Sequence, residues 1–330
     1  MFRSAKLFKR LGVQLMRKVV HNVPLFLALG LTLALPCATL TSCQASGPNK
    51  SIIVGSKMDT EGGLLGQMIR LVLIHHGYQV VDRIQLGGTA LVRKAILEGQ
   101  IDIYPEYTGN GAYFFHQANQ PVWKNAHQAW QRVHDLDLAQ NHLVWLPPAP
   151  ADNTWAIAIT DQLAQTAHLK TLSDLADYIN KGGSIKLAGS DEFVNSPAAL
   201  PSFEAAYGFH LSPQQVLTLS GGNTATTEKA CAQGTNGVNA AMAYGTDGQL
   251  AAFHLVVLAD DKNVQPVYQP APLVRQAVLL AHPNLAGDLE PVFALLDEKT
   301  LQTLNAKIVV EGQDSSTVAR QWLSEKGFLP

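Results

Sequence analysis

Few of the residue patterns that mark familiar catalytic sites occur in this chain. Its 330 residues include three cysteines, none in a Cys-x-x-Cys pair, and eleven histidines without a His-Glu-x-x-His pattern, so no metal site is expected. No Gly-x-Ser-x-Gly elbow occurs, and the glycine pairs at 62–63, 87–88 and 221–222 lack the lysine or the spacing of a phosphate-binding loop. These absences argue against a nucleotide enzyme, and we expect no cofactor.

Charged residues are also sparse. They make up 15% of the chain, and the formal net charge is −2, which gives no electrostatic footprint for nucleic acid or an anionic surface. A neutral or zwitterionic small ligand fits this balance better. Hydrophobic residues make up 47%, and the length is sufficient for two domains, each with its own core.

The N-terminal segment has the layout of a secretory signal. Basic residues recur through the first 18 positions, and 23–40 is apolar and uncharged. The run closes with Leu-Thr-Ser-Cys at 40–43, which resembles a bacterial lipobox. We therefore expect a signal peptide over 1–42, lipidation of Cys43 and a polar tether over 43–50. Plain cleavage nearby and an uncleaved anchor stay open as alternatives, because an apolar run of about 18 residues can just span a bilayer.

The expected location follows from that signal. The protein would lie in the periplasm or on the cell surface and would touch the membrane only through its lipid. No Asp follows Cys43, which in a Gram-negative cell favours the outer membrane. With Cys37 removed and Cys43 lipidated, Cys231 remains alone, so no disulfide framework is possible, and its helical surroundings predict a buried structural residue.

Short apolar runs alternate with helical patterns along the mature chain, which predicts an α/β fold with parallel sheets covered on both faces. Two proline-rich extended stretches, at 147–150 and 266–272, bracket the middle third. We interpret them as two connections that cross between a first lobe, 51–152 and 270–330, and a second lobe, 153–269. Such an arrangement places a cleft between the lobes and allows hinge closure over a ligand.

The stretch 101–110, Ile-Asp-Ile-Tyr-Pro-Glu-Tyr-Thr-Gly-Asn, is expected to organise the site. Its first residues suit a buried strand, and Pro105 is expected to end that strand because proline has no N–H to donate. The polar and aromatic residues that follow would then stand at the carboxyl end of a strand, where ligands bind in open α/β sheets. Ordinary half-buried packing of the tyrosines is an equally open interpretation.

Aromatic residues recur next to small or polar residues where predicted elements end. They are Tyr107, Trp155, Tyr244 and Tyr268. Several aromatic faces around one point form a cage for a quaternary ammonium, at about 0.5–2 kcal/mol per cation–π contact. Two alternatives stay open: Tyr244 could belong to an ordinary buried strand, and Trp155 could pack the junction between domains. The rival hypothesis is a secreted α/β enzyme that acts on a choline-like substrate, with Asp102 or Glu106 as base.

Motifs along most of the chain resemble one family. They are Gly-Ser-Lys-Met-Asp-Thr-Glu at 55–61, Leu-Gly-Gly-Thr at 86–89, Asp-Ile-Tyr-Pro-Glu-Tyr-Thr-Gly at 102–109, Asn-Thr-Trp at 153–155, Glu-Phe at 192–193 and Ala-Tyr-Gly-Thr-Asp-Gly at 243–248. Together they resemble the osmoprotectant-binding proteins (glycine betaine/choline type) of ABC importers, most closely the OsmF branch.

The resemblance implies a type II periplasmic binding protein fold and a monomer that is not an enzyme. Such a protein captures glycine betaine or a related quaternary-ammonium solute between its lobes and delivers it to an ABC permease. By motif, the four aromatic residues of the cage fall on Tyr107, Trp155, Tyr244 and Tyr268. Polar groups that hold the ligand carboxylate fall on Thr108, Asn110 and Thr246.

Three departures from the family pattern affect how tightly the carboxylate of the ligand is expected to bind. Many relatives have Gln, Thr and Arg where this chain has Gly62, Asn110 and the pair at 195–196. Each lost partner would weaken carboxylate capture by about 1–3 kcal/mol. Three alternatives therefore stay open. The affinity for betaine could be low, the ligand could be a different small zwitterion or amino acid, or the ligand could lack a carboxylate.

Overall fold

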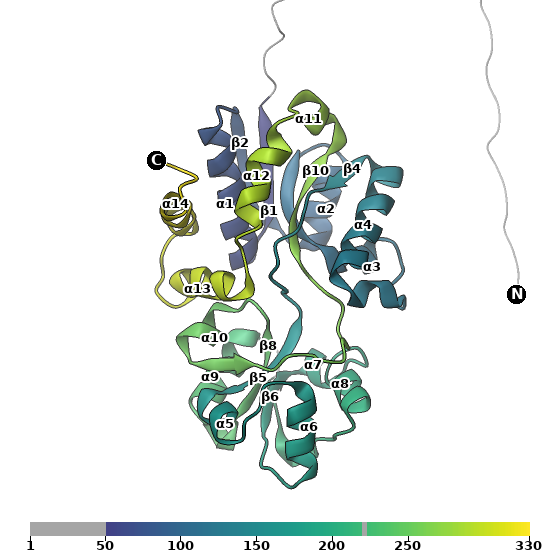
Figure 1. Ribbon diagram of the computed structural model, residues 1–330, viewed down its shortest axis with the longest axis vertical. Coiled ribbons are helices and arrows are strands. Elements are labelled where there is room, and N and C mark those ends of the chain that lie inside the picture. The colour runs from purple at the N-terminus through teal and green to yellow at the C-terminus, as the bar shows by residue number, and fades with distance from the viewer. Residues whose placement is uncertain (1–50, 220–222) are drawn as a thin grey trace, which may run out of the picture. The chain divides into compact units, whose positions relative to one another are not determined.

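The computed structural model describes residues 51–219 and 223–330. The predicted signal peptide, the tether and Cys43 lie outside these residues. The described residues belong to one compact unit with two five-stranded sheets covered by helices (Figure 1), so the predicted α/β fold is confirmed. Within the two described ranges, no helix is both long enough and apolar enough to cross a membrane.

The first sheet has the strand order β2-β1-β3-β10-β4. Its strands are β1 (Ile52–Lys57), β2 (Val80–Gly87), β3 (Ile103–Tyr107), β4 (Leu143–Trp145) and β10 (Pro270–Arg275). One face packs on α1 (Thr60–His75), α12 (Leu285–Phe293), α13 (Glu298–Val309) and α14 (Ser315–Glu325). The other face packs on α2 (Thr89–Leu97) and α4 (Ala126–Asn141). Apolar clusters on both faces make this sheet the centre of the first lobe.

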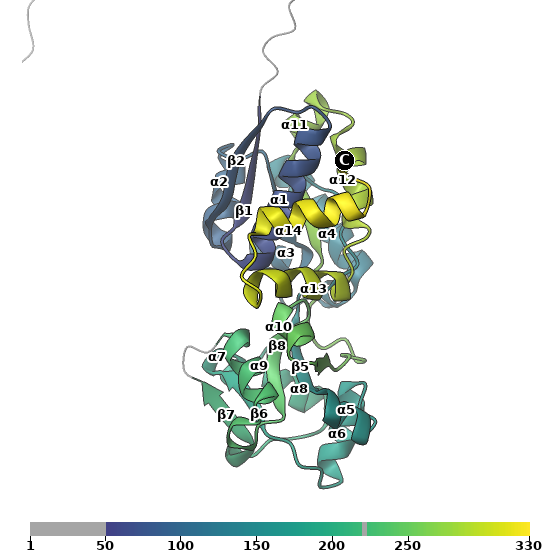
Figure 2. The ribbon, with the colours of Figure 1, turned by 90° about the vertical axis from the view of Figure 1, so that its left-hand side faces the viewer.

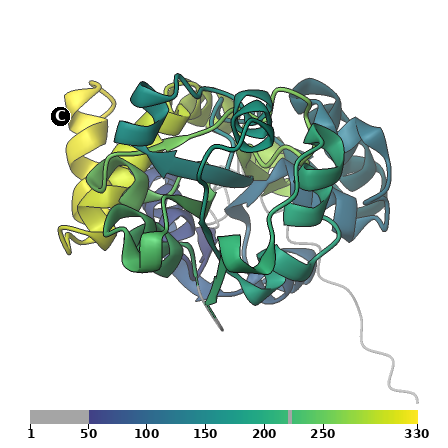
Figure 3. The same ribbon diagram turned by 90° about the horizontal axis from the view of Figure 1, so that it is seen from below.

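The second sheet has the strand order β7-β6-β8-β5-β9. Its strands are β5 (Trp155–Thr160), β6 (Leu187–Ser190), β7 (Val216–Leu219), β8 (Ala240–Tyr244) and β9 (Leu255–Val257). One face packs on α5 (Asp161–Thr166), α6 (Leu172–Asn180), α7 (Asp191–Asn195) and α8 (Leu200–Tyr207). The other packs on α9 (Thr224–Ala232) and α10 (Gly248–Ala252), where Cys231 is buried. Seen from below, this lobe lies in front, with the yellow C-terminal helices to one side (Figure 3).

Short helical segments complete the chain. They are η1 (Thr108–Asn110), α3 (Gly111–Phe114), η2 (Pro121–Lys124), η3 (Pro213–Gln215), η4 (Thr235–Gly237) and α11 (Gln276–Ala281).

Both sheets are mixed, so the expectation of parallel sheets is wrong for two strands. β10 runs antiparallel to β3 and β4, and β5 runs antiparallel to β8 and β9. A parallel neighbour requires a crossover connection, usually a helix. The chain reaches β5 and β10 from the other lobe through extended segments, so this constraint does not apply to them.

The expectation that Pro105 ends its strand is also wrong, because β3 continues to Tyr107. Pro105 lies directly opposite Pro272 of the antiparallel β10. Neither residue has an N–H, so together they form a non-hydrogen-bonded pair, which an antiparallel ladder contains at every second position. Tyr107 is therefore held by a strand, opposite Pro270, and not by a loop.

Two segments, 146–154 and 258–269, connect the lobes (Figure 1). Hydrogen bonds join the two segments. The N–H of Asn153 donates to the carbonyl of Tyr268 at 3.0 Å, and Thr154 Oγ1 donates to the carbonyl of Pro266 at 2.8 Å. A third contact joins α10 of the second lobe to α13 of the first (Figure 2). There, Gln302 Nε2 donates to the carbonyl of Gly245 at 2.7 Å.

Candidate functional site

A cavity of about 840 Å³ lies where the two lobes and both connections meet. All four aromatic residues singled out in the sequence line it, although they come from β3, β5, β8 and the second connection: Tyr107, Trp155, Tyr244 and Tyr268. Aromatic side chains with a few convergent polar groups are the usual lining of a small-molecule site. The fold thus brings together residues that are up to 161 positions apart in the sequence.

Trp155 and Tyr244 are cross-strand neighbours. They occupy directly paired positions of β5 and β8, their ring centroids are 6.5 Å apart, and their planes differ by 16°. Phe193 packs against the indole in a T-shaped arrangement, with 6.0 Å between the ring centroids. Tyr244 remains 37% exposed, so its ring is available from the cavity.

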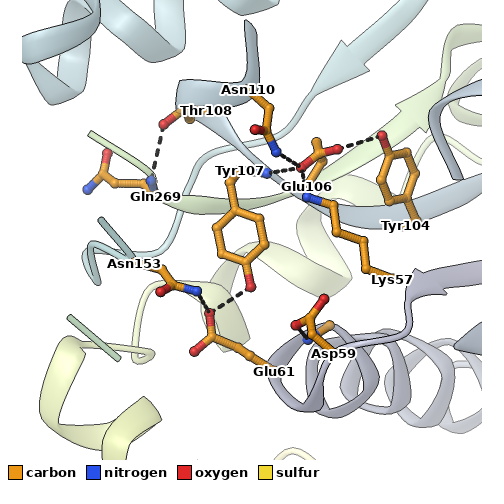
Figure 4. Close-up of polar contacts among 11 residues, drawn as sticks. Lys57, Asp59, Glu61, Tyr104, Glu106, Tyr107, Thr108, Asn110, Asn153 and Gln269 are labelled. Atoms are coloured by element: carbon orange, nitrogen blue, oxygen red, sulfur yellow. Dashed lines mark hydrogen bonds and ion pairs between the residues drawn. The ribbon is translucent and has the colours of Figure 1, made fainter. Parts of the chain in front are cut away.

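Tyr107 has a different environment. Its ring is almost completely buried, its hydroxyl donates to Glu61 Oε1 at 2.7 Å, and Lys57 Nζ lies 4.7 Å from the ring centroid (Figure 4). Burial raises the pKa of the Tyr107 hydroxyl well above its usual range, so the side chain stays neutral. The lysine ammonium occupies one side of the ring, and Tyr107 also lines the cavity.

Tyr268 is positioned by its backbone and by a glycine. Its N–H donates to Asp152 Oδ1 at 2.7 Å, and its ring lies against Gly109. A Cβ at Gly109 would meet the ring at 2.8 Å and the carbonyl of Val267 at 2.8 Å. Only glycine therefore permits this close approach of η1 to the second connection.

Glu106 is a fully buried structural residue, not a base facing the cavity. Its carboxylate pairs with Lys57 Nζ and accepts hydrogen bonds from the Tyr104 hydroxyl at 2.9 Å, the Tyr107 N–H at 2.7 Å and Asn110 Nδ2 at 2.8 Å (Figure 4). A buried carboxylate is tolerated when a cation and several hydrogen-bond donors satisfy its oxygens.

Asp102 lies away from the cavity as well. It accepts from the N–H of Ile53 at 3.0 Å and from Arg275 at 3.1 Å, which ties β1 to β10. The cavity lining includes neither Asp102 nor Glu106. The rival hypothesis of an enzyme therefore has neither of its two candidate bases at the site.

The three residues expected at a ligand carboxylate differ in position. Asn110 and Thr246 line the cavity, whereas Thr108 does not. The Thr108 hydroxyl donates to the carbonyl of Val267 at 3.1 Å and accepts from the N–H of Gln269 at 3.1 Å (Figure 4). Thr108 thus fastens η1 to the second connection, and its side chain has no free direction toward a ligand.

A cluster around Glu61 was not found from the sequence. Glu61 Oε1 accepts from Tyr107 and from Asn153 Nδ2 at 3.2 Å, and Oε2 accepts from Asn305 Nδ2 at 2.8 Å. We call Glu61, Tyr107, Asn153 and Asn305 the Glu61 cluster. All four line the cavity. The available signal was the carboxylate in Asp-Thr-Glu at the start of a helix, where α1 begins after Asp59, whose side chain caps it by accepting from the N–H of Gly62 at 2.7 Å.

Charges around the cavity are predominantly negative. The charged residues among its lining are Lys57, Asp59, Glu61, Glu192 and Asp247. The one cation among them is already paired with Glu106. Burial is the main cause that raises the pKa of Glu61 to about 7, and the nearby charge of Asp59 raises it further, while hydrogen bonds from Thr246, Tyr107 and Asn305 oppose the shift. Such a lining favours a ligand that carries positive charge.

No group of three or more His, Cys, Asp or Glu side chains suited to a metal ion occurs in the described parts of the chain.

Comparisons with known proteins agree with this geometry. Residues 50–325 match the family described as "Substrate binding domain of ABC-type glycine betaine transport system". The chain is 53% identical over 297 residues to the glycine betaine-binding protein YehZ of Escherichia coli (strain K12), covering 90% of this chain and 96% of that protein. A glycine-betaine-binding protein of Pseudomonas aeruginosa is 33% identical over 304 residues, covering 90% and 94%. The solved structure of apo YehZ from Escherichia coli has a TM-score of 0.81 and 54% identity, covering 84% of this chain and 99% of that one.

Proposed function

This chain belongs to the family of substrate-binding domains of ABC-type glycine betaine transport systems, and we propose that it captures glycine betaine or a related quaternary-ammonium solute for an ABC importer. The predicted family and the predicted type II periplasmic binding protein fold are confirmed. The named ligand of its relatives supports the proposal for this chain, since the 53% identity extends over 90% of its length.

The observation that carries the proposal is the convergence of four aromatic side chains on one cavity between the lobes. A trimethylammonium group cannot donate a hydrogen bond, so it is recognised by aromatic faces and by negative charge. The near-parallel pair of Trp155 and Tyr244 supplies two rings from the second lobe. Tyr107 and Tyr268 supply two more from the first lobe and the second connection.

For the ligand carboxylate we propose Asn110 and Thr246. Both side chains line the cavity, and Thr246 is held close to Glu61 and Asn305. Thr108 acts on the site only by positioning η1, because its hydroxyl is engaged with the backbone at 267 and 269. With few donors and predominantly negative charge, this cavity binds the ammonium end of a zwitterion better than its carboxylate end.

We also propose that the protein binds its ligand without transforming it, and that it acts as a monomer anchored by lipid at Cys43 outside the cytoplasm. The family membership supports the first statement, because its members are the substrate-binding components of transport systems. The apolar signal and the Leu-Thr-Ser-Cys ending support the anchor.

A methylation series tests the function. Calorimetric titration with glycine betaine, dimethylglycine and glycine should show affinity that increases with each methyl group, because larger and more weakly hydrated cations fit aromatic faces better. By mass action, glycine betaine at a hundredfold excess over Kd should also add about 2.7 kcal/mol to the free energy of unfolding and so raise the melting temperature. Equal affinity for glycine and glycine betaine would contradict the cage.

A further inference from the structure

The Glu61 cluster presents only donors to Glu61. The Tyr107 hydroxyl and the side-chain amides of Asn153 and Asn305 all donate to its two oxygens. An ionised carboxylate accepts all three, whereas a protonated one brings an O–H of its own that needs an acceptor. The geometry around Glu61 is therefore suited to the charged form, although its exposed fraction is only 4%.

That charge has no cation of the protein beside it. No ion pair of Glu61 occurs in the described residues, and the nearest candidate, Lys57, is paired with Glu106. A buried carboxylate without a cationic partner is costly to ionise, which is why the pKa of Glu61 is raised to about 7. Glu61 lines the same cavity as the aromatic residues, so a bound cation would supply the missing charge.

The cluster also extends to both lobes. Asn305 Nδ2, on α13 of the first lobe, donates to Glu61 Oε2 and to the carbonyl of Thr246 in the second lobe at 2.9 Å. The amide oxygens of Asn153 and Asn305 are buried and have no hydrogen-bond partner within the described part of the chain. These two unpaired acceptors belong to the same side chains whose amide nitrogens donate to Glu61.

We propose that the protonation state of Glu61 sets the preference of the site between a purely cationic quaternary ammonium, such as choline, and a zwitterionic one, such as glycine betaine. This inference rests on the proposed function. When choline binds, protonated Glu61 releases its proton to solvent, and the carboxylate becomes the counter-charge of the ammonium. Glycine betaine carries its own carboxylate, which an ionised Glu61 repels. Its affinity therefore increases less than that of choline when Glu61 loses its proton.

The cavity lining contains other titratable groups besides Glu61. Asp59 lies at the start of α1, Lys57 on β1, Tyr107 on β3, Glu192 on α7 and Asp247 just before α10, while α13 and the first connection contribute the amides of Asn305 and Asn153. Burial keeps the Tyr107 hydroxyl neutral. Burial also raises the pKa of Asp247, so this carboxyl needs its own control. The cavity lining, as far as the structure describes the chain, contains no histidine.

The coupling between proton release and ligand binding fixes how strongly the affinity depends on pH. A ligand that binds only the form with ionised Glu61 loses about tenfold in affinity between pH about 8 and pH about 6 when the group titrates near 7. It releases about 0.9 proton per molecule bound at the lower pH and about 0.1 at the higher. Neither choline nor the carboxyl of glycine betaine changes charge in this range, because α-carboxyl groups titrate near 3.5.

Calorimetric titration of the purified protein with choline and with glycine betaine, at pH about 6, 7 and 8, tests the inference. The choline-to-betaine affinity ratio should fall several-fold from the highest to the lowest pH. Titrations at pH about 6 in two buffers of different ionisation enthalpy measure the released proton directly, without any variant.

Variants then assign the proton to one group. Glu61→Gln should bind both ligands with a pH-independent ratio, and Asp247→Asn should keep the pH dependence. Glu298→Gln is the matched control, because burial raises the pKa of Glu298 to about 7 as well, but its side chain lines a separate cavity of about 260 Å³.

The outcomes separate this inference from the proposed function. Binding of both ligands with a constant ratio, or a changing ratio that persists in folded Glu61→Gln, would overturn the role of Glu61 and leave the function intact. No binding of either ligand at any pH would overturn both.

Discussion

Trp155 and Tyr244 lie directly opposite each other on β5 and β8, with ring centroids 6.5 Å apart and planes that differ by 16°. The register of an antiparallel pair brings side chains of opposed residues onto the same face of the sheet. Here that face opens on the cavity at the end of the second sheet. Two rings that are 89 residues apart in the sequence thereby act as one aromatic surface.

Replacing Trp155 should therefore weaken ligand binding more than folding. We expect Trp155→Ala to lose about 1–2 kcal/mol of binding free energy for glycine betaine, and Trp155→Phe to lose less, since phenylalanine keeps a face with a weaker quadrupole. Calorimetric titration and thermal melting measure the two effects.

Trp130→Phe is the matched control for that substitution. Trp130 is similarly half-buried, but it lies outside the cavity on α4 and donates to the carbonyl of Leu146 at 3.1 Å. It should lose about 1 kcal/mol of stability and no affinity. A Trp155→Ala protein that melts far lower yet binds a quaternary ammonium normally would show that Trp155 only packs the junction.

The buried pair of Lys57 and Glu106 should contribute strongly to folding. Lys57→Met leaves the fully buried Glu106 carboxylate without its cation, so we expect a loss of about 3–5 kcal/mol in the free energy of unfolding measured with urea. Lys94→Met provides the comparison, because the pair of Lys94 and Glu98 is exposed and contributes less than about 0.5 kcal/mol. Equal losses in the two variants would contradict the structural role of the buried pair.

The contact between α10 and α13 should depend on Gly248. A Cβ there would lie 2.4 Å from the backbone nitrogen of Ala306 and 2.5 Å from the carbonyl carbon of Asn305, so Gly248→Ala must push the two helices apart. We expect a loss of about 1–3 kcal/mol of stability and weaker ligand binding, since Thr246 and Asn305 would separate.

Gly287→Ala in α12 serves as the control, because no atom lies within 4 Å of the added Cβ. It should be neutral or stabilising by up to about 1 kcal/mol. If Gly248→Ala behaved like Gly287→Ala in urea unfolding, the close contact between the lobes would not be needed for stability.

The predicted lipidation concerns Cys43, which lies outside the described residues. Cys43→Ala, expressed in a bacterial host, should move the protein from the membrane fraction to the soluble periplasm, because the thiol that carries the lipid is gone. Unchanged fractionation would favour an uncleaved anchor or simple cleavage.

Helices and strands could be predicted from the sequence where the hydrophobic periodicity is strong. Helix α6 and strand β7 are of this kind, since each is a short amphipathic or apolar run between clear turn residues. The direction of β5 and β10 was not predictable in this way. Alternation of strands and helices predicts parallel neighbours, but it carries no information about a strand that enters from another lobe.

The polar part of the site was the hardest to predict. The aromatic residues could be singled out because they recur at element ends, whereas Thr108 was assigned to the ligand although its hydroxyl bonds to the second connection. Glu61 was missed because its partners, Asn153 and Asn305, are 92 and 244 residues away. No local pattern identifies a hydrogen-bond cluster that only the packing of both lobes creates.

A crystal structure with glycine betaine bound tests the central claim most directly. The account predicts the trimethylammonium group in the cavity between the lobes, within about 6 Å of the ring centroids of Trp155, Tyr244, Tyr107 and Tyr268. Its carboxylate should point toward Asn110 and Thr246. A ligand bound away from these four rings, or one whose ammonium lies in solvent while its carboxylate occupies the aromatic surface, would contradict the account.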